Sequence, residues 1–325
     1  MGYAPAVSKR QLDLFGPEPV QEPDPLDFSE DAELAARVPP HVRFGTSSWT
    51  FSGWGGIVYP RGVSDAVLQA RGLELYARCP LLRTVGIDRS YYRPLESSEL
   101  QRYAAQLPSD FRCVMKVWSD VTSRVDHATR ALNPHFLSAS VFTDAVLGPV
   151  SESFAAHAGP FVFELAPLRG PELPRRGELP DLLSRFFEAL PRGPRYAVEL
   201  RNRELFTPAY LRALRAYNVA HVLNYWERMP PIGEQLDVPG IFSADFVVAR
   251  LLIPPGERYA EKKAEFAPFD RIVTPQPALH EDMARLVAAA GLHRVELFVI
   301  VNNKVEGSSP LTIRTIARRV ASPVP

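Results

Sequence analysis

The sequence predicts one α/β domain, a single (β/α)8 TIM barrel preceded by a proline-rich N-terminal extension. Eight short runs of β-branched and aromatic residues alternate with segments in which apolar residues recur at helical spacing. This alternation is the pattern of a parallel sheet with helices outside it. The chain has 325 residues, enough for one barrel of roughly 250 residues and short extensions. Most runs end in charged or amide side chains, at the strand ends where barrels bind ligands.

The eight runs define the strands that we expect. In chain order they are 42–49, 82–92, 111–118, 161–167, 196–201, 219–226, 246–252 and 297–303. A helix should begin near Ser97, and residues 253–277, rich in proline and charge, indicate an insertion that can fold over the barrel mouth. We therefore expect a flexible arm over 1–41, the barrel over 42–321 and a tail over 322–325.

The arm should contain little regular structure, because its prolines interrupt any long helix or strand. One short helix is expected over 28–38, where Asp27 and Glu30 have the spacing of a capping box. Ahead of it stands a pentapeptide with three large apolar side chains and no core of its own. Its residues are Gln11, Leu12, Asp13, Leu14 and Phe15.

This pentapeptide resembles the motif by which bacterial DNA replication and repair proteins dock on the DNA polymerase sliding clamp. The resemblance implies that Gln11 fills one subsite and that Leu14 and Phe15 fill an apolar pocket. A proline-bounded, accessible segment suits a peptide ligand. The alternative is that the apolar side chains fold back onto the outside of the barrel.

Composition excludes several classes of protein. Lys plus Arg equals Asp plus Glu at 37 each, so no overall field attracts nucleic acid or membrane. Two cysteines are too few for a disulfide framework. No apolar run is long enough to span a bilayer and no signal peptide is recognisable, which favours a cytoplasmic protein. The oligomeric state cannot be predicted.

We expect neither a cofactor nor a metal. None of the seven histidines lies at the end of a predicted strand, and no glycine-rich phosphate loop or dinucleotide fingerprint occurs. Gly307, Ser308 and Ser309 open the last predicted helix, however, and their backbone N–H groups could receive an anion.

Charged residues on alternating strand positions predict a site at the barrel mouth. If the charged member of each strand points inward, Lys116, Arg201 and Arg250 face Glu164 and Glu199. Burying these charges without pairing costs several kcal/mol each, so they should interlock. The alternative is that this ring is a structural plug.

Aromatic and amide side chains near the same strand ends favour a ligand. All four tryptophans lie at a predicted strand end or in the loop after one. Aromatic faces beside amides suit a sugar or a stacked nucleobase, although the aromatic residues could equally form a lid. The expected ligand-binding residues are Ser48, Trp49, Asp88, Tyr91, Tyr92, Arg201, Asn224, Arg250, Asn302 and Asn303.

Three residues are candidates for catalysis. Glu164 and Glu199 could act as general acid and base, with Lys116 setting their ionisation apart, as in glycoside hydrolysis. Lys116 could instead form a Schiff base with a carbonyl substrate. An enzyme of this kind would be a metal-independent hydrolase or lyase. The alternative is a non-enzymatic scaffold or binding protein associated with the sliding clamp.

Several separated motifs resemble the YecE-like family, also called domain of unknown function 72, from about Phe44 to Ala317. They are Gly45-Thr46-Ser47-Ser48-Trp49, Tyr59-Pro60, Tyr91-Tyr92-Arg93, Glu199-Leu200-Arg201 and Asn302-Asn303. The resemblance implies a TIM barrel and a probable site, but no reaction. This chain has Glu164 where the family usually has Gln, and Asp88-Arg89 in place of a more common Asn-Ser.

Overall fold

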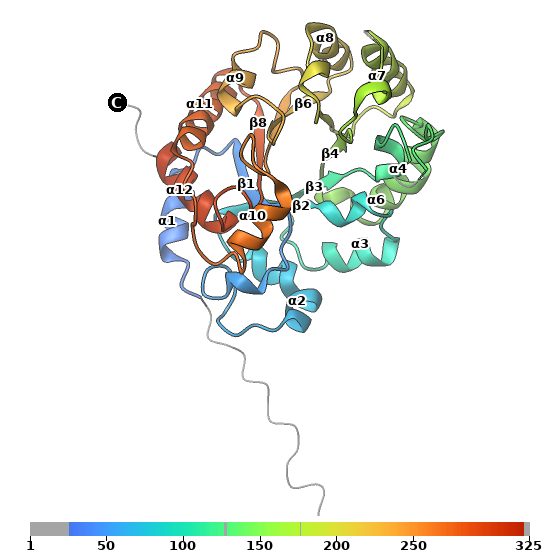
Figure 1. Ribbon diagram of the computed structural model, residues 1–325. Coiled ribbons are helices and arrows are strands. Elements are labelled where there is room, and N and C mark those ends of the chain that lie inside the picture. The colour runs from blue at the N-terminus through green and yellow to red at the C-terminus, as the bar shows by residue number, and fades with distance from the viewer. Residues whose placement is uncertain (1–25, 127–128, 176, 322–325) are drawn as a thin grey trace, which may run out of the picture.

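Eight parallel strands close into a barrel in the computed structural model, which describes residues 26–126, 129–175 and 177–321 (Figure 1). Each strand pairs with its neighbours in sequence, and β8 pairs with β1. The predicted (β/α)8 barrel is thus confirmed. The strands are β1 Val42–Thr46, β2 Leu82–Ile87, β3 Arg112–Lys116, β4 Ala158–Glu164, β5 Tyr196–Glu199, β6 Ala220–Tyr225, β7 Phe246–Leu251 and β8 Glu296–Val301.

Helices surround the barrel. In α7, residues Leu179, Leu183, Phe186 and Phe187 are buried and lie on one face, as helical spacing predicts. The first turn of α8 is capped by the Thr207 side chain, which accepts a hydrogen bond from the Tyr210 backbone N–H. The helices are α1 Ser29–Arg37, α2 Asp65–Ala77, α3 Ser97–Ala104, α4 Ser119–Thr122, α5 Ala139–Phe142, α6 Gly148–Ser153, α7 Glu178–Ala189, α8 Pro208–Ala216, α9 Ile232–Leu236, α10 Tyr259–Phe266, α11 Pro277–His293 and α12 Ser309–Ala321.

The barrel has two apolar layers. The larger lies between the strands and the helices. The smaller fills the lower interior with inward-facing residues, among them Val114, Val222, Phe246 and Phe298. Above this apolar filling, the carboxyl ends of the strands hold buried charged side chains inside the barrel.

The helix expected over 28–38 forms as α1 and packs on α12. Asp31 is 3% exposed, and both of its carboxylate oxygens accept hydrogen bonds from the guanidinium of Arg314. The expected capping box does not form, because Asp27 accepts from the Ser29 N–H and Glu30 pairs with Arg318.

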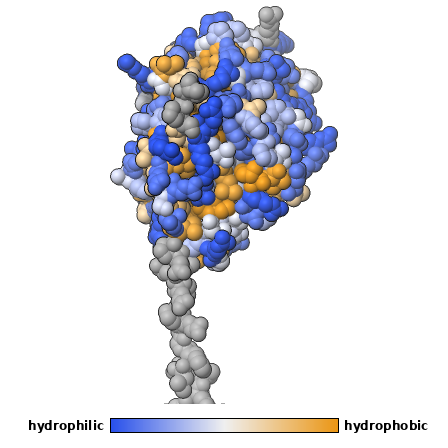
Figure 2. All heavy atoms as spheres, turned by 90° about the vertical axis from the view of Figure 1, so that its left-hand side faces the viewer, coloured by the Kyte–Doolittle hydropathy of each residue, from blue (hydrophilic) through white to orange (hydrophobic). Residues whose placement is uncertain are grey.

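On the side of the molecule drawn in Figure 2, hydrophilic and hydrophobic residues are interspersed.

The insertion after β7 packs against the loop after β1. It contains α10, and the Phe269 ring lies edge-on to Phe51 with centroids 5.6 Å apart. The backbone approaches so closely at Gly53 that a Cβ there would lie 1.8 Å from the Pro268 carbonyl oxygen. The insertion therefore lies over the carboxyl ends of the strands, on the β1 side.

The segment from Gln11 to Phe15 lies outside the described residues. Among the helices that the structure describes, none combines the length and apolar character needed to cross a membrane.

Candidate ligand site at the barrel mouth

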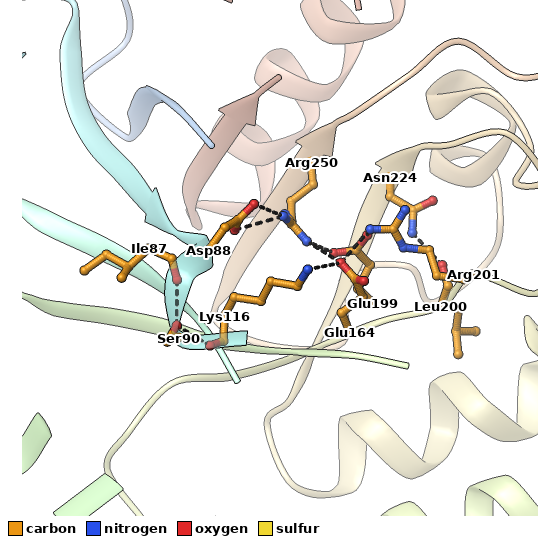
Figure 3. Close-up of polar contacts among 10 residues, drawn as sticks. All are labelled: Ile87, Asp88, Ser90, Lys116, Glu164, Glu199, Leu200, Arg201, Asn224 and Arg250. Carbon is orange, nitrogen blue, oxygen red and sulfur yellow. Dashed lines mark hydrogen bonds and ion pairs between the residues drawn. The ribbon is translucent and has the colours of Figure 1, made fainter. Parts of the chain in front are cut away.

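Six charged residues from five strand ends converge inside the barrel (Figure 3). Lys116, Glu164 and Glu199 are the last residues of β3, β4 and β5, and Arg250 lies one residue before the end of β7. Asp88 directly follows β2, and Arg201 follows β5 by two residues. The sequence-based expectation that distant charges meet at one opening is confirmed. We call these six residues the mouth network.

Arg250 is the centre of the network. One terminal nitrogen, Nη1, contacts both Glu164 Oε2, at 3.0 Å, and Glu199 Oε2. The other, Nη2, donates to both oxygens of Asp88 at 3.0 and 3.1 Å. Burial disfavours its charge, but Glu199, Asp88 and Glu164 outweigh burial and raise the pKa of Arg250. Arg250 is therefore a fixed cation that joins three carboxylates.

Glu164 connects the other two cations to this centre. Its Oε2 lies 3.0 Å from Lys116 Nζ and 2.6 Å from Arg201 Nη2. Burial alone would raise the pKa of Glu164, but the charges of Arg201, Lys116 and Arg250 more than offset it and lower that pKa. Glu164 is therefore ionised at neutral pH and cannot donate a proton there.

The mouth network has two layers, which differ in the solvent exposure of their side chains. The Asp88, Lys116 and Glu164 side chains are 32%, 12% and 10% exposed. Beneath them, the side chains of Arg201, Arg250 and Glu199 are 5%, 2% and 0% exposed. A ligand at the mouth can touch the upper layer, whereas the lower layer holds that layer in position.

Two aromatic rings flank the network. Lys116 Nζ lies 3.7 Å from the centre of the Tyr91 ring, and Arg201 Cζ lies 3.9 Å from the centre of the Trp226 ring. Burial, followed by the charge of Glu164, raises the pKa of Tyr91 to about 12, so its hydroxyl stays protonated. Both rings are only partly buried. Trp226 was not among the expected ligand-binding residues, although the sequence had placed every tryptophan near a strand end.

Several buried polar atoms beside the lower layer have no hydrogen-bond partner among the described residues. They are Nε and Nη1 of Arg201, Nε1 of Trp226 and Oδ1 of Asn224. The Asn224 Nδ2, in contrast, donates to the Leu200 carbonyl oxygen at 2.6 Å. Such atoms are costly to bury unless water or a ligand satisfies them. Asn224 lies beside the network, and its role in ligand binding stays a prediction.

Trp49 does not lie at the mouth, and this corrects the sequence-based expectation. Its ring packs edge-on against Tyr103 of α3, and a Cβ on Gly72 of α2 would lie 3.2 Å from it. It lines a separate groove of about 630 Å³, to which Phe51 and Phe269 also contribute. The strand was predicted to run to residue 49, but β1 ends at Thr46, so the tryptophan lies in the loop and pairing with neighbouring strands does not fix its direction. Ser48 lies in the same loop, where its Oγ is 3.5 Å from the Thr50 hydroxyl.

Asn303 is also absent from the mouth network, which is a second correction. Its Oδ1 accepts hydrogen bonds from Trp54 Nε1 at 3.2 Å and from the Ser309 N–H at 2.8 Å. It thereby joins the β1 loop to the start of α12. Asn302 is half-buried, and its Oδ1 accepts from the backbone N–H and Nζ of Lys304.

The start of α12, where the sequence allowed an anion to bind, is occupied by contacts within the chain. The Oδ1 of Asn303 already accepts a hydrogen bond from the Ser309 N–H, and both Ser308 and Ser309 are buried. Gly307 has φ +121°, and a Cβ there would lie 2.4 Å from the Arg271 carbonyl oxygen. The insertion therefore covers this helix terminus.

Lys304 is a residue that the sequence reasoning missed. It is 5% exposed, and burial together with the nearby charge of Lys263 lowers its pKa to about 8, although Asp88 opposes the shift. Its place directly after the paired asparagines could have indicated it. Tyr92, which was expected to bind ligand, is 78% exposed and contacts the Tyr91 ring edge-on.

Metal binding finds no support in the geometry of the described residues, where no three His, Cys, Asp or Glu side chains are grouped to hold an ion. His221, for example, is buried between the Tyr210 hydroxyl and Gln235, and burial lowers its pKa to about 4. This histidine is neutral at pH 7 and serves the packing between β6 and α8.

The family described as Protein of unknown function DUF72 matches residues 43–324. Similar solved structures include a DUF72 family protein from Enterococcus faecalis V583, in two crystal structures, and one from Thermotoga maritima MSB8. Both E. faecalis structures are 15% identical to this chain in sequence. The first has a TM-score of 0.59, and the match covers 87% of this chain and 97% of that protein. The second has a TM-score of 0.57, and the match covers 86% of this chain and 95% of that protein. The T. maritima structure shares 17% identity at a TM-score of 0.58, covering 86% of this chain and 98% of its own. At these identities the likeness shows the fold alone. No curated protein matches the chain.

Proposed function

The chain belongs to the DUF72 family of TIM barrels, and from the geometry of its mouth network we propose that it binds a hydroxyl-rich ligand of sugar or nucleotide type. The layered exposure of the network carries this proposal. A plug needs its charges buried and paired, whereas here Asp88, Lys116 and Glu164 keep accessible surface above a fully buried layer. Such fixed donors and acceptors suit hydroxyl groups.

The flanking rings favour a ligand with a flat or apolar face. The Tyr91 ring lies against Lys116, and the Trp226 ring lies against Arg201. Pyranose rings and nucleobases both pack on aromatic side chains. The three cations and three carboxylates of the network cancel, so the charge of Lys304 also allows a ligand that carries one anionic group.

The proposed chemistry differs from a glycosidase with two free carboxylates. Glu199 is wholly buried beneath Arg250, so we assign it the part of a positioning residue. Glu164 remains ionised and can accept hydrogen bonds but cannot act as a general acid at neutral pH. Any proton transfer in this site would therefore need a group other than Glu164 acting as the acid.

Isothermal titration calorimetry on the full chain tests the proposal. The panel should hold neutral sugars, polyols, sugar phosphates, nucleosides and nucleotides. Lys116→Met should weaken the best binder at least about tenfold, since a charge-assisted hydrogen bond contributes about 1.5–3 kcal/mol. Gln69→Ala, in the groove beside Trp49, is the matched control and should bind as the native chain does.

If the mouth network is a structural plug, the expected results of the titrations are the opposite. If the network is only structural, no member of the panel binds, and Lys116→Met changes the free energy of unfolding alone. Equal binding by the native chain and Lys116→Met would also contradict the proposal.

We further propose that the N-terminal segment docks on the DNA polymerase sliding clamp, which would bring the barrel to sites of replication or repair. The complete pentapeptide from Gln11 to Phe15 and its proline-rich surroundings support this. Purified clamp should retain the full chain and lose it when Leu14 and Phe15 are both replaced by Ala. Equal retention of the two would contradict clamp docking and leave the mouth proposal untouched.

A further inference from the structure

The groove beside Trp49 is built from five separate parts of the chain. It is lined by the loop after β1, by α2, by the turn after β2, by α3 and by the insertion after β7. Its volume of about 630 Å³ is that of a binding site, and the mouth network contributes no residue to it.

Aromatic rings form the apolar part of the groove. The ring of Trp49 lies edge-on to Tyr103 with centroids 5.3 Å apart, and that of Phe51 lies edge-on to Phe269 at 5.6 Å. Trp49 and Phe269 are 9% and 8% exposed, so packing holds both rings in place. Such rigid rings suit the side chains of leucine and phenylalanine.

Charged side chains stand beside the rings. The Arg89 side chain is 59% exposed and lies 3.8 Å from Glu99, a carboxylate that Arg93 already holds through two hydrogen bonds at 2.7 and 3.0 Å. Arg102 and Asp65 are exposed, and neither forms an ion pair within the described part of the chain. The groove therefore offers two arginines on one side and a carboxylate on α2.

We propose that this groove is the docking site of the chain's own N-terminal segment, Gln11 to Phe15. Leu12, Leu14 and Phe15 pack against the aromatic rings, and the carboxylate of Asp13 pairs with the arginines of the groove. The segment has the apolar, acidic, apolar order that such a lining complements. This inference goes beyond the proposed function and depends on neither the mouth ligand nor the clamp.

The described part of the chain begins near the groove. Arg314 Nη2 donates both to Asp31 of α1, at 2.7 Å, and to the Ile57 carbonyl oxygen, at 3.0 Å. Ile57 belongs to the loop after β1, which lines the groove as far as Gly53. From Phe15 to Leu26 the chain advances eleven residues, and an extended chain of that length spans up to about 36 Å. The segment can therefore reach the groove.

Docking in the groove and docking on the sliding clamp use the same side chains, so each excludes the other. If both occur, the clamp has to displace the segment from the groove. The groove would then regulate clamp binding.

Fluorescence anisotropy on the full chain tests the inference. A fluorescein-labelled peptide of residues 8–17 is titrated with the native chain and with the Leu14→Ala/Phe15→Ala variant. In the native chain the tethered segment competes with the peptide at an effective concentration on the order of millimolar. The variant should therefore bind the peptide at least about tenfold more tightly. Binding by the variant that is absent, or no tighter than that of the native chain, would overturn the inference.

A charge reversal locates the bound peptide. In the background of the double variant, Arg102→Glu should weaken peptide binding at least about fivefold, because Asp13 then meets a like charge. The matched control is Arg212→Glu, an exposed arginine of α8, which follows β5 across the closed barrel from α2 (Figure 1). Equal effects of the two reversals would place the peptide elsewhere and overturn the assignment to the groove.

Light scattering shows whose segment occupies the groove. A monomeric native chain supports docking within one molecule. A native dimer that the double variant converts to a monomer would contradict it and assign the groove to the segment of a second copy. None of these measurements uses the clamp or a mouth ligand, so their failure leaves both earlier proposals untouched.

Discussion

The two ends of the barrel both carry clustered charges, but they are built differently. At the amino end, Glu296 pairs with Arg43 and Arg195, and the Arg195 guanidinium lies over the rings of Phe246 and Phe298. At the carboxyl end, the mouth network joins three cations to three carboxylates, and four of its six members are at least 90% buried. At the amino end, the charged cluster is partly exposed to solvent and lies over the apolar residues of the lower barrel interior.

The difference teaches that a charged cluster does not by itself indicate a site. Glu296 and its partners keep 17–40% of their side-chain surface exposed, and exposed pairs contribute little. The mouth network carries the full desolvation cost of buried charge. This cost falls at the end of the barrel where TIM barrels bind ligands, which is why we propose a ligand site there and not at the amino end.

The largest effect should come from removing the central cation. Arg250→Met leaves three carboxylates without their shared partner and should lower the free energy of unfolding by about 3–5 kcal/mol. Arg195→Met at the amino end should cost about 1 kcal/mol or less. Urea denaturation of both variants checks this, and similar losses would remove the distinction between the two ends.

A smaller effect should follow from Glu164→Gln. We expect a loss of about 1–3 kcal/mol at pH 7, because three cations lose a shared partner. The pKa of Glu164 is lowered in the folded protein, so its contribution is fully present above the unfolded-chain pKa of 4.5 and is lost as pH falls from there through the folded pKa. The variant should therefore show a flatter fall in stability from pH 5 to pH 3, and identical slopes would argue against this contribution.

Lys304→Met should stabilise the protein at neutral pH. The pKa of Lys304 is lower when folded, so the unfolded chain binds more protons between about pH 8 and 10.5 and the stability of the native chain rises across that window. Removing the amine should add about 1 kcal/mol at pH 7, allowing for solvent around the group, and nothing near pH 10.5. Thermal unfolding at both pH values measures this; a variant less stable at pH 7 contradicts it.

Tyr92→Ala should have the smallest effect. The ring is 78% exposed, so its loss should change stability by less than about 0.5 kcal/mol and leave binding unaltered. Tyr91→Ala is the comparison, because that ring lies against Lys116 and should be required for binding. Loss of binding in Tyr92→Ala would extend the site onto the outer surface.

The fold could be predicted because every strand repeats the same signal. Alternating apolar runs and helical segments set the strand order, and the alternation of side chains within each strand brought Lys116, Glu164 and Glu199 to one interior. The rule that side chains alternate between the two faces holds while a residue lies in a strand, because pairing with neighbouring strands fixes the direction of its side chain.

Beyond the last paired residue of a strand, neighbouring strands no longer fix the direction of a side chain. This explains why Trp49 and Asn303 were misplaced. Trp49 and Asn303 both follow their strands by more than one residue, and their directions are set by α2, α3 and α12. The role of Lys304 depends on the insertion, since Phe269 and Lys263 produce its environment. Contacts between such distant segments leave no periodic signal in the sequence.

A crystal structure with the best calorimetric binder tests the central claim most directly. We predict electron density between Tyr91 and Trp226, in contact with Lys116 and Asp88 above the intact pairing of Arg250. Density for the ligand only in the groove beside Trp49, with the mouth holding nothing but water, would contradict the assignment of the mouth network as the binding site.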